Sequence, residues 1–247
     1  MKRRWVKVLT IVVVILAGLF VALDRIAVHF AEKEAVALVQ EKYGYGASST
    51  DGRTEVSIHG FPFLTQAADM RLDHVTLSAG NFSVNTTVNA QGDHLNIRAL
   101  DLELRDLTAS SLSARSAGAN LVTGRVVIGY EDLSGVVSRL LAKGGGLTVA
   151  PADQAQNNQT QSGTAQNGGS GEEARLKVSG TWDGRALNTP ASISVAADEF
   201  QFRAPEISPE PYTWRIPLPQ NIDITGSRAT PEGLELELTG HQVVLGG

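Results

Sequence analysis

The chain has 247 residues, of which 42% are apolar, a formal net charge of −5 and no cysteine. Apolar content of this size can supply a hydrophobic core, so the chain is globular rather than disordered overall. The absence of cysteine excludes disulfides, thiolate metal sites, thiol nucleophiles and an acylated cysteine. Four basic residues stand within the first seven positions, so the remainder is more acidic than the total. This balance argues against nucleic-acid binding and against a purely electrostatic attraction to anionic lipid.

The N-terminus has a basic flank followed by an uncharged, mostly aliphatic run from Val8 to Leu23. Such a pattern fits either a cleaved signal peptide or an uncleaved membrane anchor. Because Asp24 and Arg25 follow directly and no small-residue cleavage site does, we favour an uncleaved signal anchor over residues 1–23. The basic flank then predicts a single pass through the plasma membrane, with the N-terminus cytoplasmic and residues 24–247 on the outer face.

Residues 24–43 show a helical pattern, with apolar residues on one face and charged residues largely elsewhere. Two interpretations remain open for this segment. It is either a direct continuation of the anchor, which would hold the outer domain close to the membrane, or an ordinary helix that covers the core. Gly44 and Gly46 are expected to end it.

Beyond residue 50 the apolar pattern changes to an alternation, which is typical of strands with one apolar and one wet face. The parity of this alternation shifts at Asp73-His74 and again at Ala99. Each shift predicts a β-bulge, which bends a long strand. Bent strands of this kind predict a curved sheet.

The second half of the chain continues this pattern around one helix. A strand over 125–130 leads into a helix over about 132–143. Residues 150–173 contain no large apolar side chain and predict a flexible polar insertion. Alternation resumes at Leu176 and runs to the end of the chain. The sequence therefore predicts an α+β fold in which a single outer domain, residues 24–247, wraps a long, curved, mostly antiparallel sheet around one or two helices.

The segment Gly60-Phe61-Pro62-Phe63-Leu64 interrupts the strand pattern with an apolar, aromatic run. Its proline is unsuited to a helix interior or a central strand, so we expect a corner without backbone hydrogen bonds. Two roles are open for the aromatic side chains. They either plug one end of the core, or line the mouth of a groove and dip into the bilayer.

No arrangement of residues typical of an active site is visible. The chain lacks the familiar zinc, nucleophile-elbow and phosphate-loop motifs. The nearest polar cluster is Asp69, Asp73 and His74, and on an alternating strand these acidic residues belong to a solvated face. A hydrolase would become plausible only if His59, Asp69 and His74 met over a pocket. The sequence therefore predicts no enzyme, no metal site and no cofactor.

Several segments together carry a resemblance to a known family. They are the basic anchor, the amphipathic helix after it, "VSIHGFPFLTQ" at 56–66, "GRVVIGYEDLSGVV" at 124–137 and "LPQNIDITGSRATPEGLELELTG" at 218–240. This combination resembles the actinobacterial LmeA-type phospholipid-binding proteins of the cell envelope, over nearly the whole chain except 150–173. The resemblance implies a non-enzymatic lipid binder, related in fold to tubular lipid-binding proteins of the bactericidal permeability-increasing type. It also implies a connection with envelope glycolipid maturation or lipid transfer.

A curved sheet around a helix would leave an apolar groove, where acyl chains gain about 0.8 kcal/mol per buried CH₂. The expected partners are therefore phospholipid and the plasma membrane. We expect the groove or its mouth to be lined by Phe61, Pro62, Phe63, Leu64, Met70, Leu72, Val136, Leu140 and Leu141. Residues that flank the aromatic segment are candidates for headgroup contacts, namely Arg53, His59 and Arg71. The alternative is a structural envelope protein that binds a polysaccharide or an enzyme partner and whose groove is simply core.

Overall fold

The computed structural model describes residues 2–43, 53–85, 94–109, 117–141, 146–152, 173–196, 199–215 and 221–245. Most of the predicted insertion, residues 153–172, lies outside these ranges, as do Gly44 and Gly46. Within them the chain forms three helices and eleven strands. The α+β class is therefore confirmed.

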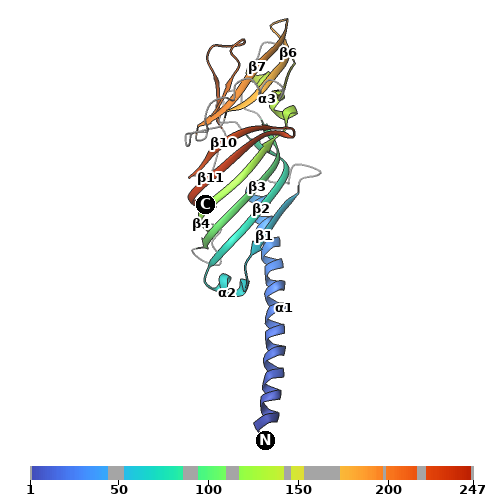
Figure 1. Cartoon of the computed structure of the whole chain (residues 1–247), viewed down its shortest axis with the longest axis vertical. Coiled ribbons are helices and arrows are strands. Elements are labelled where there is room, and N and C mark those ends of the chain that lie inside the picture. The colour runs from blue at the N-terminus through green and yellow to red at the C-terminus, as the bar shows by residue number, and fades with distance from the viewer. Residues whose placement is uncertain are drawn as a thin grey trace, which may run out of the picture.

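A single helix, α1 (Lys2–Tyr43), makes up the N-terminal part of the chain and extends away from the strands (Figure 1). The stretch Thr10–Glu41 is long and apolar enough to cross a membrane. At 1.5 Å per residue α1 is about 60 Å long. A bilayer core of about 30 Å takes only half of that length. Residues 24–43 continue the apolar run as one helix, as the first interpretation predicts, and three of their side chains also pack against the core, as the second predicts.

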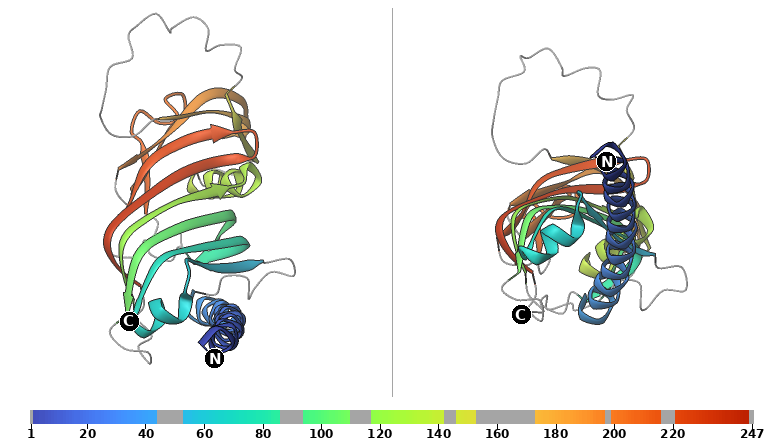
Figure 2. Two further views of the ribbon diagram at one scale, coloured as in Figure 1. Left: turned by 60° about the horizontal axis from the view of Figure 1, so that its bottom comes forward. Right: turned by 90° about the horizontal axis from the view of Figure 1, so that it is seen from below.

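Six antiparallel strands form the larger sheet, in the order β1-β2-β3-β4-β11-β10. Their bounds are β1 Thr54–His59, β2 Arg71–Asn85, β3 His94–Ala109, β4 Ala117–Ile128, β10 Ile222–Thr230 and β11 Gly233–Leu245. The sheet is strongly curved, and a short helix, α2 (Phe63–Ala68), lies at the end of the sheet next to α1 (Figure 2). The longest strands, of 15 and 16 residues, are about 50 Å long.

The remaining strands form a second antiparallel sheet of five, which the sequence did not indicate. Its order follows the chain, with β5 Leu147–Pro151, β6 Ala174–Trp182, β7 Arg185–Ala196, β8 Glu199–Arg203 and β9 Tyr212–Arg215. Helix α3 (Tyr130–Leu141) packs along β5, where the Ser134 hydroxyl accepts the Val149 N–H at 2.8 Å. The buried Ser227 hydroxyl of β10 donates to the Ile193 carbonyl of β7 at 3.2 Å and so joins the two sheets.

In four neighbouring strands of the larger sheet, the alternation of inward-facing and outward-facing side chains reverses. The reversals lie side by side across the sheet. The pairing skips one residue on each strand there, namely Asp73 in β2, Asp106 in β3, Asn120 in β4 and Gln242 in β11. Asp106 and Gln242 have positive φ angles of 50° and 51°. The sequence located the parity shift at Asp73 correctly. The predicted β-bulge is wrong in kind, because equal numbers of residues are skipped on both strands and the pairing resumes in register.

The second predicted shift has the same form. Between β2 and β3 the pairing passes from Gly80 and Ala99 to Phe82 and Ile97. The skipped residue on β2, Asn81, has a φ of 50°, which asparagine tolerates better than most residues. At these skipped residue pairs the strands can bend while their apolar side chains stay on the inside of the sheet.

Gly233 begins β11 where the chain turns back from β10, and we expect its replacement to destabilise the fold. A Cβ atom at this position would lie 2.2 Å from the Ile128 carbonyl oxygen. Relief of this clash requires backbone movement, so Gly233→Ala should lower the free energy of unfolding by about 1–3 kcal/mol. Gly146→Ala is the control, since its Cβ would meet nothing within 4 Å. Urea unfolding of both variants measures the difference, and equal stabilities would contradict the prediction.

Candidate functional site

Apolar side chains fill the inside of the curved six-stranded sheet along the length of its strands. Buried members of this interior, each at most 9% exposed, include Val75, Leu77, Leu100, Leu104, Val122, Leu236 and Leu238. Helix α1 adds the partly buried Ala35, Val36 and Val39. The interior is therefore apolar along its whole length. Its two ends, one at α3 and one beside α1, differ in the residues that form them.

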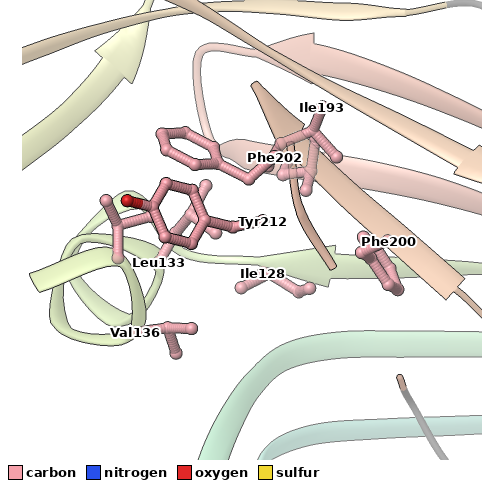
Figure 3. Close-up of a pocket in the computed structure, with 9 residues that line it drawn as sticks. Ile128, Leu133, Val136, Ile193, Phe200, Phe202 and Tyr212 are labelled. Carbon is pink, nitrogen blue, oxygen red and sulfur yellow. The ribbon is translucent and has the colours of Figure 1, made fainter. Parts of the chain in front are cut away.

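At the α3 end a small apolar pocket lies between the helix and both sheets (Figure 3). Its lining consists of Ile128, Leu133, Val136, Val137, Ile193, Phe200, Phe202, Tyr212 and Leu234. The volume is about 20 Å³, which is room for about one water molecule. No charged side chain lines it, so its chemistry suits hydrocarbon.

The predicted residues of α3 belong to this end of the interior. Val136 is 8% exposed and lines the pocket, and Leu141 is 5% exposed. Leu140 belongs to the same helix, but its side chain lies outside the part of the chain that the structure describes. The helix begins at Tyr130 and ends at Leu141, two residues earlier at each end than the sequence indicated.

A second, open cleft of about 550 Å³ lies over the bend of β2 and β3 and the first turn of α3. Its lining is mostly polar, and two of its polar side chains are held by hydrogen bonds, one within the lining and one to a residue outside it. The Asn96 amide donates to Asp132 at 2.8 Å, and Arg98 donates to the Glu232 carbonyl at 3.3 Å. The cleft is therefore unsuited to acyl chains.

The aromatic segment lies at the opposite end of the interior, beside α1. Phe63 is buried, at 8% exposed, whereas Phe61 is 57% and Leu64 36% exposed. Pro62 is half-buried and is the N-cap residue of α2, a short helix that the sequence did not reveal. The Pro62 carbonyl accepts the Gln66 N–H at 3.4 Å, so the prediction of a corner without backbone hydrogen bonds is wrong. Phe63 is thus buried without belonging to the continuous core, whereas Phe61 and Leu64 face outwards, and both roles of the segment stay predictions.

Asp24, the first charged residue after the apolar run, holds this segment to α1. Its side chain is fully buried, and its Oδ1 atom accepts the Leu64 N–H at 2.9 Å. Its Oδ2 atom accepts a hydrogen bond from Arg25 at 2.8 Å. The Arg25 guanidinium lies 5.4 Å from the centre of the Phe61 ring, and the Phe20 ring meets Phe61 edge-on at 6.5 Å.

A second contact holds the sheet to α1 two helical turns further on. The Glu32 Oε1 atom accepts the Ile58 N–H of edge strand β1 at 2.9 Å. Val28, between the two carboxylates on the same face of the helix, is only 7% exposed. We refer to Asp24, Val28 and Glu32 as the mount. The sequence did not indicate the mount, because its partners are backbone N–H groups distant in the chain.

The other predicted residues are spread over the sheet. Met70, with a φ of 53°, lies in the turn between α2 and β2 and is 40% exposed. Leu72 is half-buried against the core, and Arg71 is exposed beside it. Arg53 immediately precedes β1, whereas His59 ends it, so these two headgroup candidates lie at opposite ends of that strand.

His59 and His74 are brought together on the outer face of the sheet. Their rings stack with centroids 4.5 Å apart, and His74 Nε2 lies 3.1 Å from Glu103 Oε1. Arg105 also donates to Glu103, and this hydrogen bond lowers the pKa of the Glu103 carboxyl below its ordinary value. Neither histidine lines the apolar pocket or the polar cleft. Among the described residues, no group of three or more His, Cys, Asp or Glu could hold a metal ion.

The lowered pKa of Glu103 predicts a pH dependence of stability. Its contribution to the free energy of unfolding is complete above the ordinary pKa of 4.5 and is lost as the pH falls through the lower folded value. Glu103→Gln should therefore destabilise the protein at pH 7 and have less effect at about pH 3.5. Urea unfolding at both pH values tests this, and equal effects at the two would contradict it.

An α+β domain with an apolar interior, joined to a helix long enough to cross a bilayer, fits a membrane-associated protein that binds an apolar ligand. The chain belongs to the LmeA-like phospholipid-binding family, whose model matches residues 22–239. This membership confirms the resemblance and supports phospholipid binding. No curated protein and no solved structure matches the chain.

Proposed function

We propose that the chain is a membrane-anchored phospholipid-binding protein that encloses acyl chains inside its six-stranded sheet. The family match over residues 22–239 is the observation that supports this most strongly. The apolar lining of the interior agrees with it, because each CH₂ group moved from water to such a surface gains about 0.8 kcal/mol. The proposed role is binding without catalysis.

The acyl-chain site is proposed for the α3 end of the interior. Ligand pockets usually measure about 300–1,000 Å³, whereas the pocket there is about 20 Å³. Entry of a lipid therefore requires α3 to move away from Phe200, Phe202 and Leu234. Val136 and Leu133, on the inner face of α3, would then contact the chain.

We further propose that α1 remains attached and places residues 24–247 on the outer face of the plasma membrane. Support comes from the unbroken helix across Leu23, Asp24 and Arg25, and from the four basic residues before the apolar run. In this position the protein would carry or present phospholipid for lipid transfer or envelope glycolipid maturation. Arg71 and His59 lie at the α2 end, so we propose that they contact the headgroup as a lipid enters there, before its acyl chains reach the α3 end.

A photoreactive phospholipid tests the proposal on the full chain. The chain is purified in mild detergent and loaded with phosphatidylglycerol that carries a diazirine in one acyl chain. Mass spectrometry should find crosslinks in α3 and in β8 as well as in the apolar run of α1. Crosslinks confined to α1 would mean that lipid contacts only the anchor. That result would favour the alternative, an envelope scaffold whose interior is simply core.

A further inference from the structure

The mount places an exposed apolar surface of the domain at a defined height along α1. Phe61 and Leu64 are exposed, and the Phe61 ring contacts Phe20 of α1, which is itself 41% exposed. The contact between Phe20 and Phe61 thus joins exposed apolar side chains from two segments about forty residues apart in the chain. An apolar patch with aromatic residues is a common feature of membrane-contacting surfaces.

The depth of this patch follows from the contact between two rings. Phe20 belongs to the apolar run that ends at Leu23, so it lies within the proposed membrane span. Because the Phe61 ring packs edge-on against Phe20 at 6.5 Å, it lies at nearly the same height. Phe61 is therefore at the level of the bilayer and not above it.

The positive charge of Arg25 lies beside the patch, where the boundary between acyl chains and headgroups is expected. Arg25 is exposed and lies one residue after the buried Asp24. Its Nη2 atom lies 3.4 Å from the Gly60 carbonyl, and its guanidinium stands over Phe61. An arginine beside an aromatic ring, just beyond an apolar run, is placed to meet lipid phosphates.

The mount fixes the geometry, so the patch cannot simply swing away from the membrane. Asp24 and Glu32 accept backbone N–H groups from Leu64 and Ile58, which lie on either side of Phe61 in the chain. Two such attachments, two turns apart on one helix face, restrain both the height and the tilt of the domain.

We propose that Phe61 and Leu64, together with Phe20 and Arg25 of α1, form a docking surface for the leaflet from which the domain projects. The occupant is the lipid bilayer that α1 crosses. The α2 end of the interior then faces that leaflet directly, and lipid enters or leaves the protein from its own membrane. This inference rests on the proposed membrane anchor.

Spin labels on the full chain in nanodiscs of phosphatidylcholine and phosphatidylglycerol test the docking surface. Because the chain has no cysteine, single labels can be introduced by Phe61→Cys, Leu64→Cys, Leu16→Cys and Thr213→Cys. Leu16 lies in the apolar run, and Thr213 is an exposed residue of β9. Collision with oxygen reports on the bilayer, and collision with a water-soluble nickel chelate reports on water.

Positions 61 and 64 should behave like position 16, with nickel collisions about tenfold or more below those at position 213. Nickel access at 61 and 64 equal to that at 213, with position 16 protected, would overturn the docking surface alone and would leave the anchor intact. That outcome would point to a protein partner for the patch. Nickel access at position 16 would overturn the anchor and the docking surface together. Phospholipid in the interior is measured separately by the crosslinking experiment.

Discussion

Val136→Trp should remove most phospholipid from the interior of the protein while leaving it folded. Val136 is 8% exposed and lines a pocket of only about 20 Å³ between α3 and the two sheets. An indole would fill the space that α3 must open for an acyl chain. Overpacking costs about 1–3 kcal/mol, which a domain with a stability of about 5–15 kcal/mol can tolerate. We expect interior crosslinks from the diazirine lipid to fall about tenfold or more.

Arg139→Trp is the matched control, because Arg139 is exposed on the same helix and the substitution adds the same side chain outside the pocket. It should leave the interior crosslinks unchanged. Circular dichroism and thermal unfolding of both variants separate blocked binding from unfolding. If Val136→Trp is folded and still carries interior lipid at the level of the control, the acyl-chain site does not lie at α3.

The double variant Asp24→Ala, Glu32→Ala should release the domain from α1 without unfolding it. Both carboxylates accept N–H groups of the domain, Leu64 and Ile58 respectively. Without these acceptors the N–H groups lose their protection, so their hydrogen exchange should become about tenfold faster or more. Strand β1 still pairs with β2 over its full length, which keeps the sheet intact.

The distance between spin labels at Lys33→Cys on α1 and Thr213→Cys on β9 also reports whether the domain is released from the helix. In the natural background we expect one narrow distance distribution, and in the double variant a broad one. Glu34→Ala is the control, since Glu34 is exposed on the same stretch of helix. A distribution that stays narrow in the double variant would show that the apolar packing of α1, through Val28, Ala35, Val36 and Val39, is enough to hold the domain in place.

Local patterns predicted much of the fold. Alternation located the strands and both changes of parity, because one face of each strand is buried and a shift in pattern must accompany a bend. The helical stripe located α3 to within two residues. The division into two sheets could not be predicted, because it depends on which distant strands pair. Alternation within a strand contains no information about its partner.

The sequence predicted which residues of the candidate site are apolar and buried better than it predicted where they lie relative to one another. Phe63, Val136 and Leu141 are all buried, but Val136 and Leu141 belong to the core at the α3 end, whereas Phe63 lies outside that core beside α1. Nothing in a single sequence separates those ends. The functions of Asp24 and Glu32 were also hidden. Each of these carboxylates accepts a backbone N–H, and because every residue except proline has such a group, the sequence does not mark the partner residue.

The position of α1 on β1 also bears on aggregation of the protein. Strand β1 is an edge of the six-stranded sheet, and unpaired edges recruit strands from other copies. Glu32 occupies the Ile58 N–H of that edge, and the helix lies along the strand. A soluble version that begins after residue 43 would expose the edge and is expected to self-associate, whereas one that begins shortly before Asp24 retains its cover. The helix that attaches the domain to the proposed membrane is thus also expected to keep neighbouring copies from pairing at the edge strand β1.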